Sequence, residues 1–572
     1  MNTLPDELPV SVVALNREDR SPRNAAAAVA RAAGQGSRLV VLPFGFPESA
    51  APATWAKRLA RKHSVYLIVG YEEEGRQVAS IISPRGKVLG STAQTHAFPD
   101  ETVVLGDRIA PIATELGVSI GLSVGTDIYF PETHWSLARQ GADLLVHLDR
   151  ERSACDHFYR VLSPRIRAFD VHRPLLVSAP TSNLLKLVHN EEMGIAGVPL
   201  VSACIFDQNG AVLASTGYSE GVASATLRFA QRCISLQNAN IPLHRGLDVW
   251  KLHYVDSREQ FFGPLRCAFA PRPKPRYRKR KIRVAILSHY YCHQIGKEDG
   301  VFFDLLKEAV RNKPDIILAT EMEKECRPDD PAIAKKFEKM VRMTARAGSY
   351  LLFGGIRVAH PGEKGDRCSH AWLWNRKGKL VFESRIMLYG QGNGQTAYDT
   401  DFGRIGIRLC GDVYAPELDR LFALQGVDIV FNPSMSWGVS GLVNTELNQV
   451  RAMDNGHFVA TAHLAFSDAG QRSHVIDPNG VVVAASEYYQ NSVLLADINL
   501  DTPRGVFVAD GERPVPAGVY LEKYRKPVKH RLLGREEWLS LRRPELYEGI
   551  DRDLPGDPFV EGRKEAAPKA GR

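Results

Sequence analysis

Hydrophobic positions along the chain fall into two alternating patterns. Short, nearly continuous apolar runs, such as residues 10–15 and 38–43, flank a stretch with helical spacing at residues 24–33. Apolar runs of this kind are typical of strands that are buried on both faces. The second half of the chain opens in the same way, with a helical stretch at residues 301–310 between two apolar runs. The alternation predicts an α/β fold.

The two halves of the chain resemble each other in sequence. Residues 121–132 align without a gap with residues 406–417, and each segment leads into a predicted helix and then a strand. An Arg-Ala pair follows in each half, beginning at Arg167 and at Arg451. Self-similarity over such a long period indicates two copies of one domain. A chain of 572 residues is also too long for a single hydrophobic core.

The repeat divides the chain into four expected segments. We expect a first domain at 1–230, a connector at 231–280, a second domain at 281–500 and a C-terminal extension at 501–572. The extension ends in a polar stretch, from which we expect partial disorder.

Charge adds little to this picture. The net charge is +8, and much of it lies in the proline-containing basic run at 272–281. Such a run can bind nucleic acid or an acidic partner. Because no nucleic-acid-binding motif accompanies it, we interpret it as a solvated linker and do not expect a nucleic acid partner. No apolar run approaches the roughly 20 residues that a membrane-spanning helix needs. The start of the chain also lacks a secretion signal, so we expect a cytoplasmic protein without a membrane segment.

The eight cysteines form no CxxC pair and no cluster with zinc-ligand spacing. Buried free thiols are the default interpretation for most of them in a reducing compartment. Cys410 differs because it follows a predicted strand at 405–409 and precedes Gly411 and a predicted helix. A strand-to-helix elbow of this kind exposes a side chain beside backbone N–H groups, which can bind a developing oxyanion.

Several motifs occur in a fixed order in the second half. Glu321 ends a strand, Arg385 follows a hairpin, and Cys410 opens a Cys-x-Asp-x-x-x-Pro-Glu motif. Asn432-Pro-Ser comes next, and Arg451-Ala-x-Asp-Asn follows it. This order is similar to that of the nitrilase, or carbon–nitrogen hydrolase, superfamily, and the resemblance covers both halves.

The resemblance implies a fold and a chemistry. It implies tandem αββα sandwiches, packed as an intrachain pseudo-dimer through the helical face beside the nucleophile strand. It also implies a Glu–Lys–Cys triad that cleaves non-peptide carbon–nitrogen bonds through a covalent cysteine intermediate. No cofactor and no metal are implied.

The resemblance assigns roles in the second half. Cys410 falls at the nucleophile position and Glu321 at the base position, and the backbone of Gly411 would help to bind the oxyanion. A buried core thiol is the alternative for Cys410. Arg385 stands where the family has lysine, and it would either stabilise the oxyanion or bind a substrate carboxylate.

The second acid of the family has no clear counterpart. Between Glu383 and Cys410 the only acids are Asp399 and Asp401, and of these Asp399 is a candidate for substrate binding. Trp437 follows the Asn-Pro-Ser motif and would line the pocket or pack in the core.

The first half lacks the catalytic residues. Phe44 replaces the glutamate, Gln94 the lysine and Gly125 the cysteine, so we expect neither nucleophile, base nor fixed charge there. The sequence therefore predicts a hydrolase that acts on a small amide, nitrile or carbamoyl substrate through Cys410. The alternative is a pseudoenzyme that acts as a binding or scaffolding protein. Formation of a homo-oligomer is left open.

Overall fold

The computed structural model describes most of the chain. The described residues are 4–16, 19–48, 51–150, 157–181, 203–217, 219–229, 262–289, 299–326, 331–357, 368–386, 397–434, 441–463, 472–487, 490–504, 507–510 and 529–552. Trp437 lies outside these residues. None of the described helices combines the length and apolar composition that crossing a bilayer requires.

The chain forms two compact units that do not follow a simple cut between its halves. The first unit comprises residues 1–234 and 505–557, and the second comprises 235–504 and 558–572. Each unit therefore includes a segment that follows the repeated domain of the other unit in sequence.

The first unit is built on two sheets. One has the strand order β10-β1-β2-β3-β4-β5, with β13 also paired to β1, and the other has the order β12-β11-β9-β8-β7-β6. The strands of the first sheet are β1 Glu7–Asn16, β2 Leu39–Phe44, β3 Tyr66–Glu73, β4 Arg76–Ile82, β5 Val88–Ala93, β10 Pro180–Thr181 and β13 Gly221–Arg228. Those of the second are β6 Ile112–Ala113, β7 Ser119–Val124, β8 Leu144–Leu148, β9 Leu175–Ser178, β11 Cys204–Phe206 and β12 Val212–Ser215.

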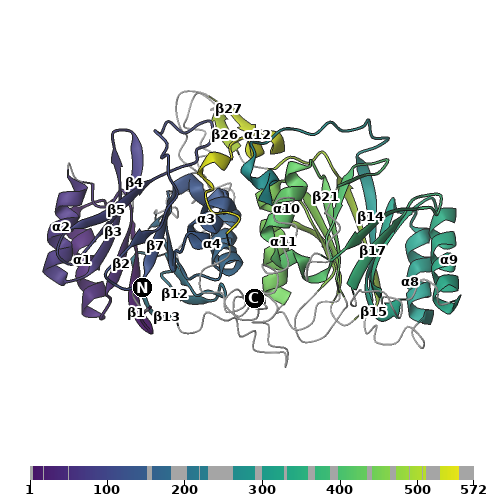
Figure 1. Cartoon of the computed structure of the whole chain (residues 1–572), viewed down its shortest axis with the longest axis horizontal. Coiled ribbons are helices and arrows are strands. Elements are labelled where there is room, and N and C mark those ends of the chain that lie inside the picture. The colour runs from purple at the N-terminus through teal and green to yellow at the C-terminus, as the bar shows by residue number, and fades with distance from the viewer. Residues whose placement is uncertain are drawn as a thin grey trace, which may run out of the picture. The chain divides into compact units, whose positions relative to one another are not determined.

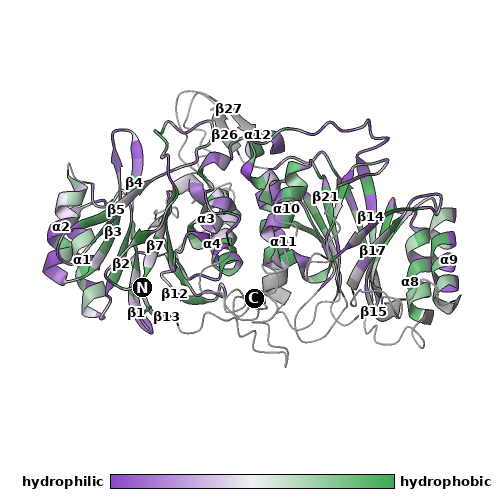
Figure 2. Cartoon of the chain, viewed as in Figure 1, coloured by the Kyte–Doolittle hydropathy of each residue, from purple (hydrophilic) through white to green (hydrophobic). Residues whose placement is uncertain are grey.

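Helices cover the outer faces of this pair of sheets (Figure 1). The helices are α1 Pro22–Gly34 and α2 Pro52–His63 on one side, and α3 Pro131–Arg139 and α4 His157–Val171 on the other. α1 shows why the sequence folds this way. Ser21 caps its first turn by accepting a hydrogen bond from the Asn24 N–H at 3.3 Å. Its buried residues recur at helical spacing, while its two charged residues, Arg23 and Arg31, are exposed, and the helix carries both hydrophobic and hydrophilic colours in Figure 2.

Strand alternation divides the apolar residues of the first unit between two cores. Val10 and Val12 of β1 belong to one buried cluster with Ile120 and Leu122 of β7, between the sheets. The neighbouring Val13 instead belongs to the cluster that includes the apolar faces of α1 and α2. Because side chains alternate along a strand, β1 contributes to both layers.

The second unit repeats this architecture. Its sheets have the orders β18-β17-β16-β15-β14-β25 and β19-β20-β21-β22-β23-β24. The strands of the first are β14 Lys281–Ser288, β15 Ile316–Cys326, β16 Tyr350–Arg357, β17 Cys368–Trp374, β18 Leu380–Arg385 and β25 Ser492–Asn499. Those of the second are β19 Tyr398–Asp399, β20 Arg404–Ile407, β21 Ile429–Pro433, β22 Phe458–Ala462, β23 His474–Ile476 and β24 Val482–Ala485.

The helices of the second unit are α8 Asp299–Arg311, α9 Pro331–Arg346, α10 Pro416–Leu424 and α11 Gly441–Asn455. α8 and α9 lie beside the sheet of β14–β18, and α10 and α11 beside the other sheet (Figure 1). The tandem αββα sandwiches predicted from the sequence are therefore confirmed. The pseudo-dimeric packing of the two units stays a prediction.

The basic run before β14 is bound to the second unit, and its interpretation as a solvated linker was wrong. Lys274 Nζ lies 2.6 Å from Asp428 Oδ1, and Arg280 Nη1 lies 3.0 Å from Asp428 Oδ2. Lys279 Nζ lies 2.6 Å from Asp315 Oδ1. The carboxylate of Asp428 is almost fully buried, so two cations from the run compensate its charge.

Two short segments complete the units. In the second unit the turn η4 Pro264–Arg266 packs on α10, with Leu265 fully buried. The first unit gains a strand pair, β26 Phe507–Asp510 with β27 Lys529–Leu532, and then the helix α12 Arg535–Ser540 and the turn η7 Pro544–Leu546.

Candidate functional site

Cys410 is the first residue of a strand-to-helix elbow in the second unit. It follows β20 and opens the 3₁₀ turn η6, Cys410–Tyr414, which leads into α10. Its backbone φ is 44°, in the left-handed region that non-glycine residues rarely adopt. The side chain is partly exposed. Strain of this kind, kept by the surrounding structure, is common at functional sites.

The elbow is held by the residue two positions after the cysteine. The buried Asp412 carboxylate accepts a hydrogen bond from the Leu409 N–H at 3.1 Å. In the first unit Asp127 binds the Val124 N–H in the same way, at 3.2 Å. Both aspartates therefore fix the elbow, and Gly411 is the next residue of the turn that Asp412 holds.

Tyr414 ends the same turn, and the pKa of its hydroxyl depends on the charge of Cys410. Burial raises the pKa of its hydroxyl well above the ordinary value, and a negative charge on Cys410 raises it further. The phenol therefore stays protonated and remains a hydrogen-bond donor beside the elbow.

Glu321 lies in the interior between the two sheets of the second unit. It pairs with Gly354 of β16 just after an irregularity in β15 and is 2% exposed. A Cβ built on Gly354 would lie 3.2 Å from both the Glu321 Cα and the Pro433 Cβ. Pro433 ends β21, the neighbour of β20, so the structure brings Glu321 to the end of the sandwich at which Cys410 emerges.

The strand register of the β17–β18 hairpin, which precedes the elbow, decides which face of the sheet carries Arg385. Arg385 pairs with His370 across β17 and β18. The His370 ring stacks on that of Trp372, with centroids 5.6 Å apart, and Trp372 belongs to the core under α8 and α9. Because paired residues in a sheet share a face, the register places Arg385 on the helix-facing side of β18.

The sequence alignment pairs Gln94 of the first unit with Arg385, but the strand register of the two hairpins differs from this alignment by one residue. In the first unit the Gln94 N–H donates to the Gln77 carbonyl at 2.8 Å, one step beyond the pair Val78–Ala93. In the second unit the Ile386 N–H donates to the Ser369 carbonyl at 2.9 Å, one step beyond His370–Arg385. By this register Ile386 is the counterpart of Gln94. The catalytic role of Arg385 therefore rests on the resemblance alone.

Asp399 lies at the other end of β20. Its carboxylate accepts hydrogen bonds from Arg404 Nε at 3.0 Å and from the Tyr277 hydroxyl at 2.7 Å. Burial raises the pKa of this carboxyl, but the bonds from Arg404 and Tyr277 outweigh burial, and the pKa lies below its ordinary value. Six residues of extended strand span roughly 20 Å, so Asp399 is remote from Cys410 along the strand.

The three substituted positions of the first unit come together. Gly125 has the same left-handed conformation as Cys410, with a φ of 54°. A Cβ built on Gly125 would lie 2.5 Å from Gln94 Oε1. The guanidinium of Arg150 lies over the Phe44 ring, 5.6 Å from its centroid. The fold therefore keeps the elbow here, and Gln94 fills the space beside it.

Two charged residues beside this position were missed by the sequence argument. Gln94 Nε2 lies 3.2 Å from Glu101 Oε2, and the hydroxyl of Thr126, next to Gly125, donates to both oxygens of Glu101. Arg150 is also close, with its Cδ 3.5 Å from the Cβ position of Gly125. The expectation that no fixed charge remains in the first half was therefore wrong.

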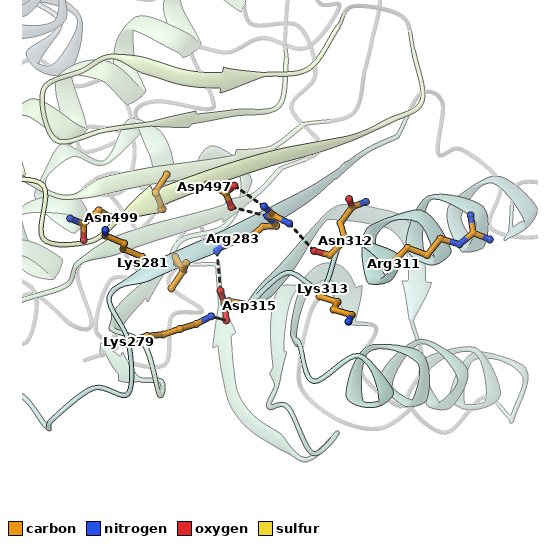
Figure 3. A pocket seen from close by; sticks show the side chains of 11 residues that line it. Lys279, Lys281, Arg283, Arg311, Asn312, Lys313, Asp315, Asp497 and Asn499 are labelled. Atoms are coloured by element: carbon orange, nitrogen blue, oxygen red, sulfur yellow. Dashed lines mark hydrogen bonds and ion pairs between the residues drawn. The ribbon is translucent and has the colours of Figure 1, made fainter.

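One cavity of the second unit is distinct from the elbow. It is a depression of about 630 Å³ at the end of the second unit where β14 begins, opposite to Glu321. Its charged lining consists of Lys279, Lys281, Arg283, Arg311, Lys313, Asp315 and Asp497 (Figure 3). Both of its carboxylates are paired, Asp315 with Lys279 and Asp497 with Arg283. Among the described residues, no group of three or more side chains has a metal-binding arrangement.

A duplicated αββα sandwich with a cysteine at the elbow of one copy defines the class of fold and site. The profile of the carbon–nitrogen hydrolase family matches residues 22–232 and 304–506. The chain belongs to this family.

Its relatives include amidases. Omega-amidase NIT2 of Mus musculus is 27% identical over 184 residues, which are 28% of this chain and 66% of the mouse protein. The chain thus spans just under two thirds of that relative. Deaminated glutathione amidase of Synechocystis sp. (strain PCC 6803 / GT-S) is 32% identical over 197 residues, 30% of this chain and 72% of that protein. Among solved structures, Saccharomyces cerevisiae Nit3 is 21% identical, with a TM-score of 0.34 over 39% of this chain and 91% of that chain.

Proposed function

We propose that the second unit is an amidase-type carbon–nitrogen hydrolase with Cys410 as its nucleophile and Glu321 as its base. The observation that carries the proposal is the left-handed backbone of Cys410 at the elbow, where the first unit has Gly125. A cysteine that keeps this costly conformation is readily explained if its thiol must emerge at the turn. The burial of Glu321 at the same end of the sandwich supports the choice of base.

The reaction follows from these groups. Glu321 takes the thiol proton, and Cys410 Sγ attacks the carbonyl carbon of a small amide, while N–H groups of the elbow at Gly411 bind the oxyanion. The C–N bond then breaks, and the amine leaves with the proton from Glu321. Water gives a proton to Glu321 and attacks the thioester carbonyl. The C–S bond then breaks, the acid leaves, and the thiolate of Cys410 takes the proton back from Glu321. Nitrile and carbamoyl substrates remain alternatives, and the omega-amides named for the relatives are the first amides to test.

A second candidate function is a catalytically inactive binding protein. The observation that favours it is Ile386 at the register position of Gln94, because the cation of Arg385 is then offset by one residue from that position. Arg385 would serve a reaction only if its side chain reached the site from the neighbouring position.

Thiol reactivity tests the proposal directly. Cys267 is exposed, whereas Cys410 and Cys204 are only partly exposed, so access alone favours modification of Cys267. With iodoacetamide at neutral pH and mass mapping of the products, we expect Cys410 to react fastest, and Glu321→Gln to slow it. Faster labelling of Cys267 would contradict activation of Cys410. Rapid labelling of Cys410 without ammonia release from any amide would favour the binding protein.

A further inference from the structure

Residues 535–552, which we name the C-terminal strap, pack inside the first unit although they follow the second domain in sequence. Trp538 of the strap is 1% exposed. Its ring stacks on Phe130, with centroids 5.7 Å apart, and meets Tyr129 edge-on at 5.8 Å. Both partners lie at the elbow that carries Gly125, in the turn η1 Gly125–Tyr129 and directly after it. The strap therefore covers the elbow of the first unit.

A buried ion pair joins the strap to the start of α3. Arg542 Nε lies 2.6 Å from Glu132 Oε1, and both side chains are fully buried. The two charges depend on each other, because removing one would leave the other buried without compensation.

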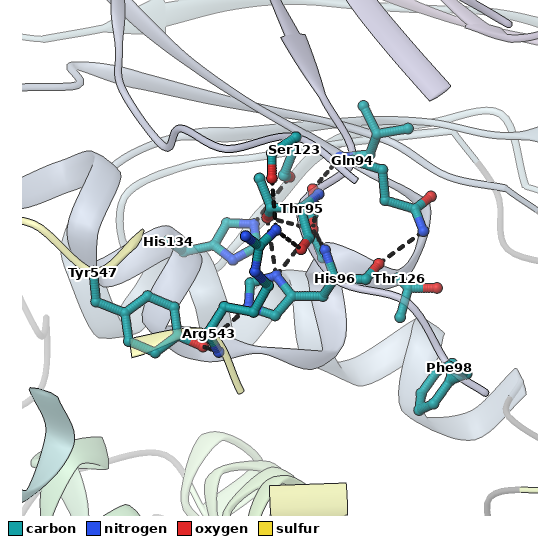
Figure 4. Close-up of polar contacts among 12 residues, drawn as sticks. Gln94, Thr95, His96, Phe98, Ser123, Thr126, His134, Arg543 and Tyr547 are labelled. Atoms are coloured by element: carbon teal, nitrogen blue, oxygen red, sulfur yellow. Dashed lines mark hydrogen bonds and ion pairs between the residues drawn. The ribbon is translucent and has the colours of Figure 1, made fainter. Parts of the chain in front are cut away.

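The strap also holds the loop that carries Gln94. Arg543 Nη1 donates to the carbonyl oxygens of Thr95 at 3.1 Å and Gly106 at 2.6 Å. The Tyr547 hydroxyl lies 3.0 Å from His96 Nε2, and the other ring nitrogen of His96 lies 3.1 Å from Asp127 (Figure 4). A continuous set of hydrogen bonds thus runs from the strap through the loop to the aspartate that fixes the elbow.

Contacts at the far end of α3 complete the interaction. Arg139, the last residue of α3, donates to the Ile550 carbonyl, and Gln140 Nε2 donates to the Glu548 carbonyl at 2.8 Å. The strap therefore engages α3 from Glu132 at its start to Arg139 at its end.

We propose that the first unit functions as a docking domain whose ligand is the chain's own C-terminal strap. Its binding surface consists of η1, α3 and the loop of residues 94–106. The ligand is recognised by an aromatic anchor, Trp538, by the guanidinium of Arg542 and by the hydroxyl of Tyr547. This role gives the first unit a function that needs no thiol at Gly125, and it secures the end of the chain that follows the candidate active site.

The docking interaction is noncovalent, so it should survive a break in the chain. A site-specific protease sequence inserted between residues 511 and 528, outside the described residues, allows the strap to be cut from the folded full chain. We expect the cut tail to co-elute with the rest of the protein in size-exclusion chromatography. We also expect Arg542→Ala to weaken its retention by roughly 100-fold or more, because Glu132 is left buried and unpaired.

Arg552→Ala is the matched control. Arg552 lies at the end of the strap and pairs with Glu548 at 3.2 Å, but both side chains are more than half exposed. This substitution should leave retention of the tail unchanged. If Arg542→Ala prevents folding, Tyr547→Phe carries the test, since it removes only the hydroxyl near His96 and should increase hydrogen exchange in residues 94–106.

Two results would overturn the proposal. One is release of the wild-type tail on cutting, with hydrogen exchange in residues 94–106 unchanged. The other is equal retention of the wild-type, Arg542→Ala and Arg552→Ala tails. Neither result depends on whether Cys410 is catalytic, because the docking surface and the elbow of Cys410 belong to different units.

Discussion

Gln94 occupies the space that a side chain on Gly125 would need. The Cβ position of Gly125 lies 2.5 Å from Gln94 Oε1, closer than any ordinary contact with a Cβ atom. Gln94 is fully buried and also donates to the His96 carbonyl at 2.8 Å, so its position is fixed. A thiol cannot simply be restored at this elbow, since the amide has taken its place.

We therefore predict that Gly125→Ala destabilises the first unit. Overpacking against Gln94 and the left-handed φ should together cost about 1–3 kcal/mol. Gly217→Ala is the control, because Gly217 has a similar φ of 62° with nothing within 4 Å of its Cβ position. Urea denaturation of the full chain measures both. Equal destabilisation by the two substitutions would show that Gln94 moves aside without cost.

The second prediction concerns Arg385. Because the register places its side chain on the helix-facing side of β18, we expect Arg385→Ala to retain most of the turnover that the Cys410 site supports. Ammonia release from an amide substrate is the measurement. Loss of turnover in Arg385→Ala, with partial recovery in Arg385→Lys, would instead establish the electrostatic role that the sequence suggested.

Much of the fold could be predicted from the sequence, because buried parallel strands are nearly continuous apolar runs. The run 10–15 became β1, the run 282–287 became β14, and the helical stretch 301–310 became α8. The gap-free match of 121–132 with 406–417 correctly paired Gly125 with Cys410, since both residues have a left-handed φ.

The hairpin before the elbow was harder, because Arg385 and Ile386 are neighbours and a cation was expected. The sequence does contain a reference point for aligning the two hairpins, namely the turn glycines Gly86 and Gly378. Counting from each glycine leads to Gln94 and to Ile386, in agreement with the strand register. A shift of one residue moves a side chain to the opposite face of a sheet, so the choice matters.

The ordered strap could not have been predicted in the same way. Residues 535–552 carry no repeat of the first domain, and their partners, such as Glu132, are about 400 residues away in sequence. Similarly, Glu101 and Arg150 become part of the Gln94 site only through tertiary packing.

The third prediction concerns a buried ion pair beside the Cys410 elbow. Arg408 is fully buried and contacts the equally buried Asp419 of α10. At the matching positions the first unit has Ser123 and His134, whose side chains lie 3.2 Å apart. Burial lowers the pKa of His134 well below its ordinary value, so this pair is neutral. One unit thus uses charges where the other uses a neutral hydrogen bond.

We expect Asp419→Ala to destabilise the second unit by about 3–5 kcal/mol, because Arg408 would remain buried without its partner. The double substitution Arg408→Ser with Asp419→His copies the first unit and should recover a substantial part of this loss. Urea denaturation across the cycle of single and double variants is the measurement. Additive effects of the two substitutions would contradict the coupling.

The fourth prediction is a pH dependence that originates at His474. His474 Nδ1 lies 2.9 Å from the Arg472 carbonyl, and Nε2 lies 3.1 Å from Asn448 Nδ2. A carbonyl can only accept, so the proton is on Nδ1 and the amide donates to Nε2, which defines a neutral imidazole. Burial lowers the pKa of His474 to about 4, the Arg472 carbonyl opposes this effect, and the charge of Arg408 adds to it.

The direction in which stability changes with pH follows from the number of protons that the folded and unfolded states bind. Between the unfolded pKa of about 6.5 and the folded value of about 4, the unfolded chain binds more protons at His474. The second unit should therefore lose roughly 3 kcal/mol of stability from this residue as the pH falls through that range. Burial also lowers the pKa of His463 well below its ordinary value, so His463 adds a loss of the same sign.

Asp419 contributes in a lower pH range. Burial raises the pKa of its carboxyl, but Arg408 and His457 outweigh burial and hold the pKa below its ordinary value. Its contribution to stability is present above the unfolded carboxyl pKa and is lost only as the pH falls through the lower folded value. The loss between about pH 7.5 and about pH 5 is therefore assigned to the histidines.

His474→Gln tests this assignment, because glutamine can still hydrogen-bond to Asn448 but binds no proton. We expect the unfolding free energy of the second unit to fall less between about pH 7.5 and about pH 5 in the variant than in the wild type. Hydrogen exchange of β22 and β23 amides in a urea series, corrected for intrinsic rates, reports that unit alone. An unchanged pH dependence would mean that the folded protein binds a proton at His474 as readily as the unfolded chain does.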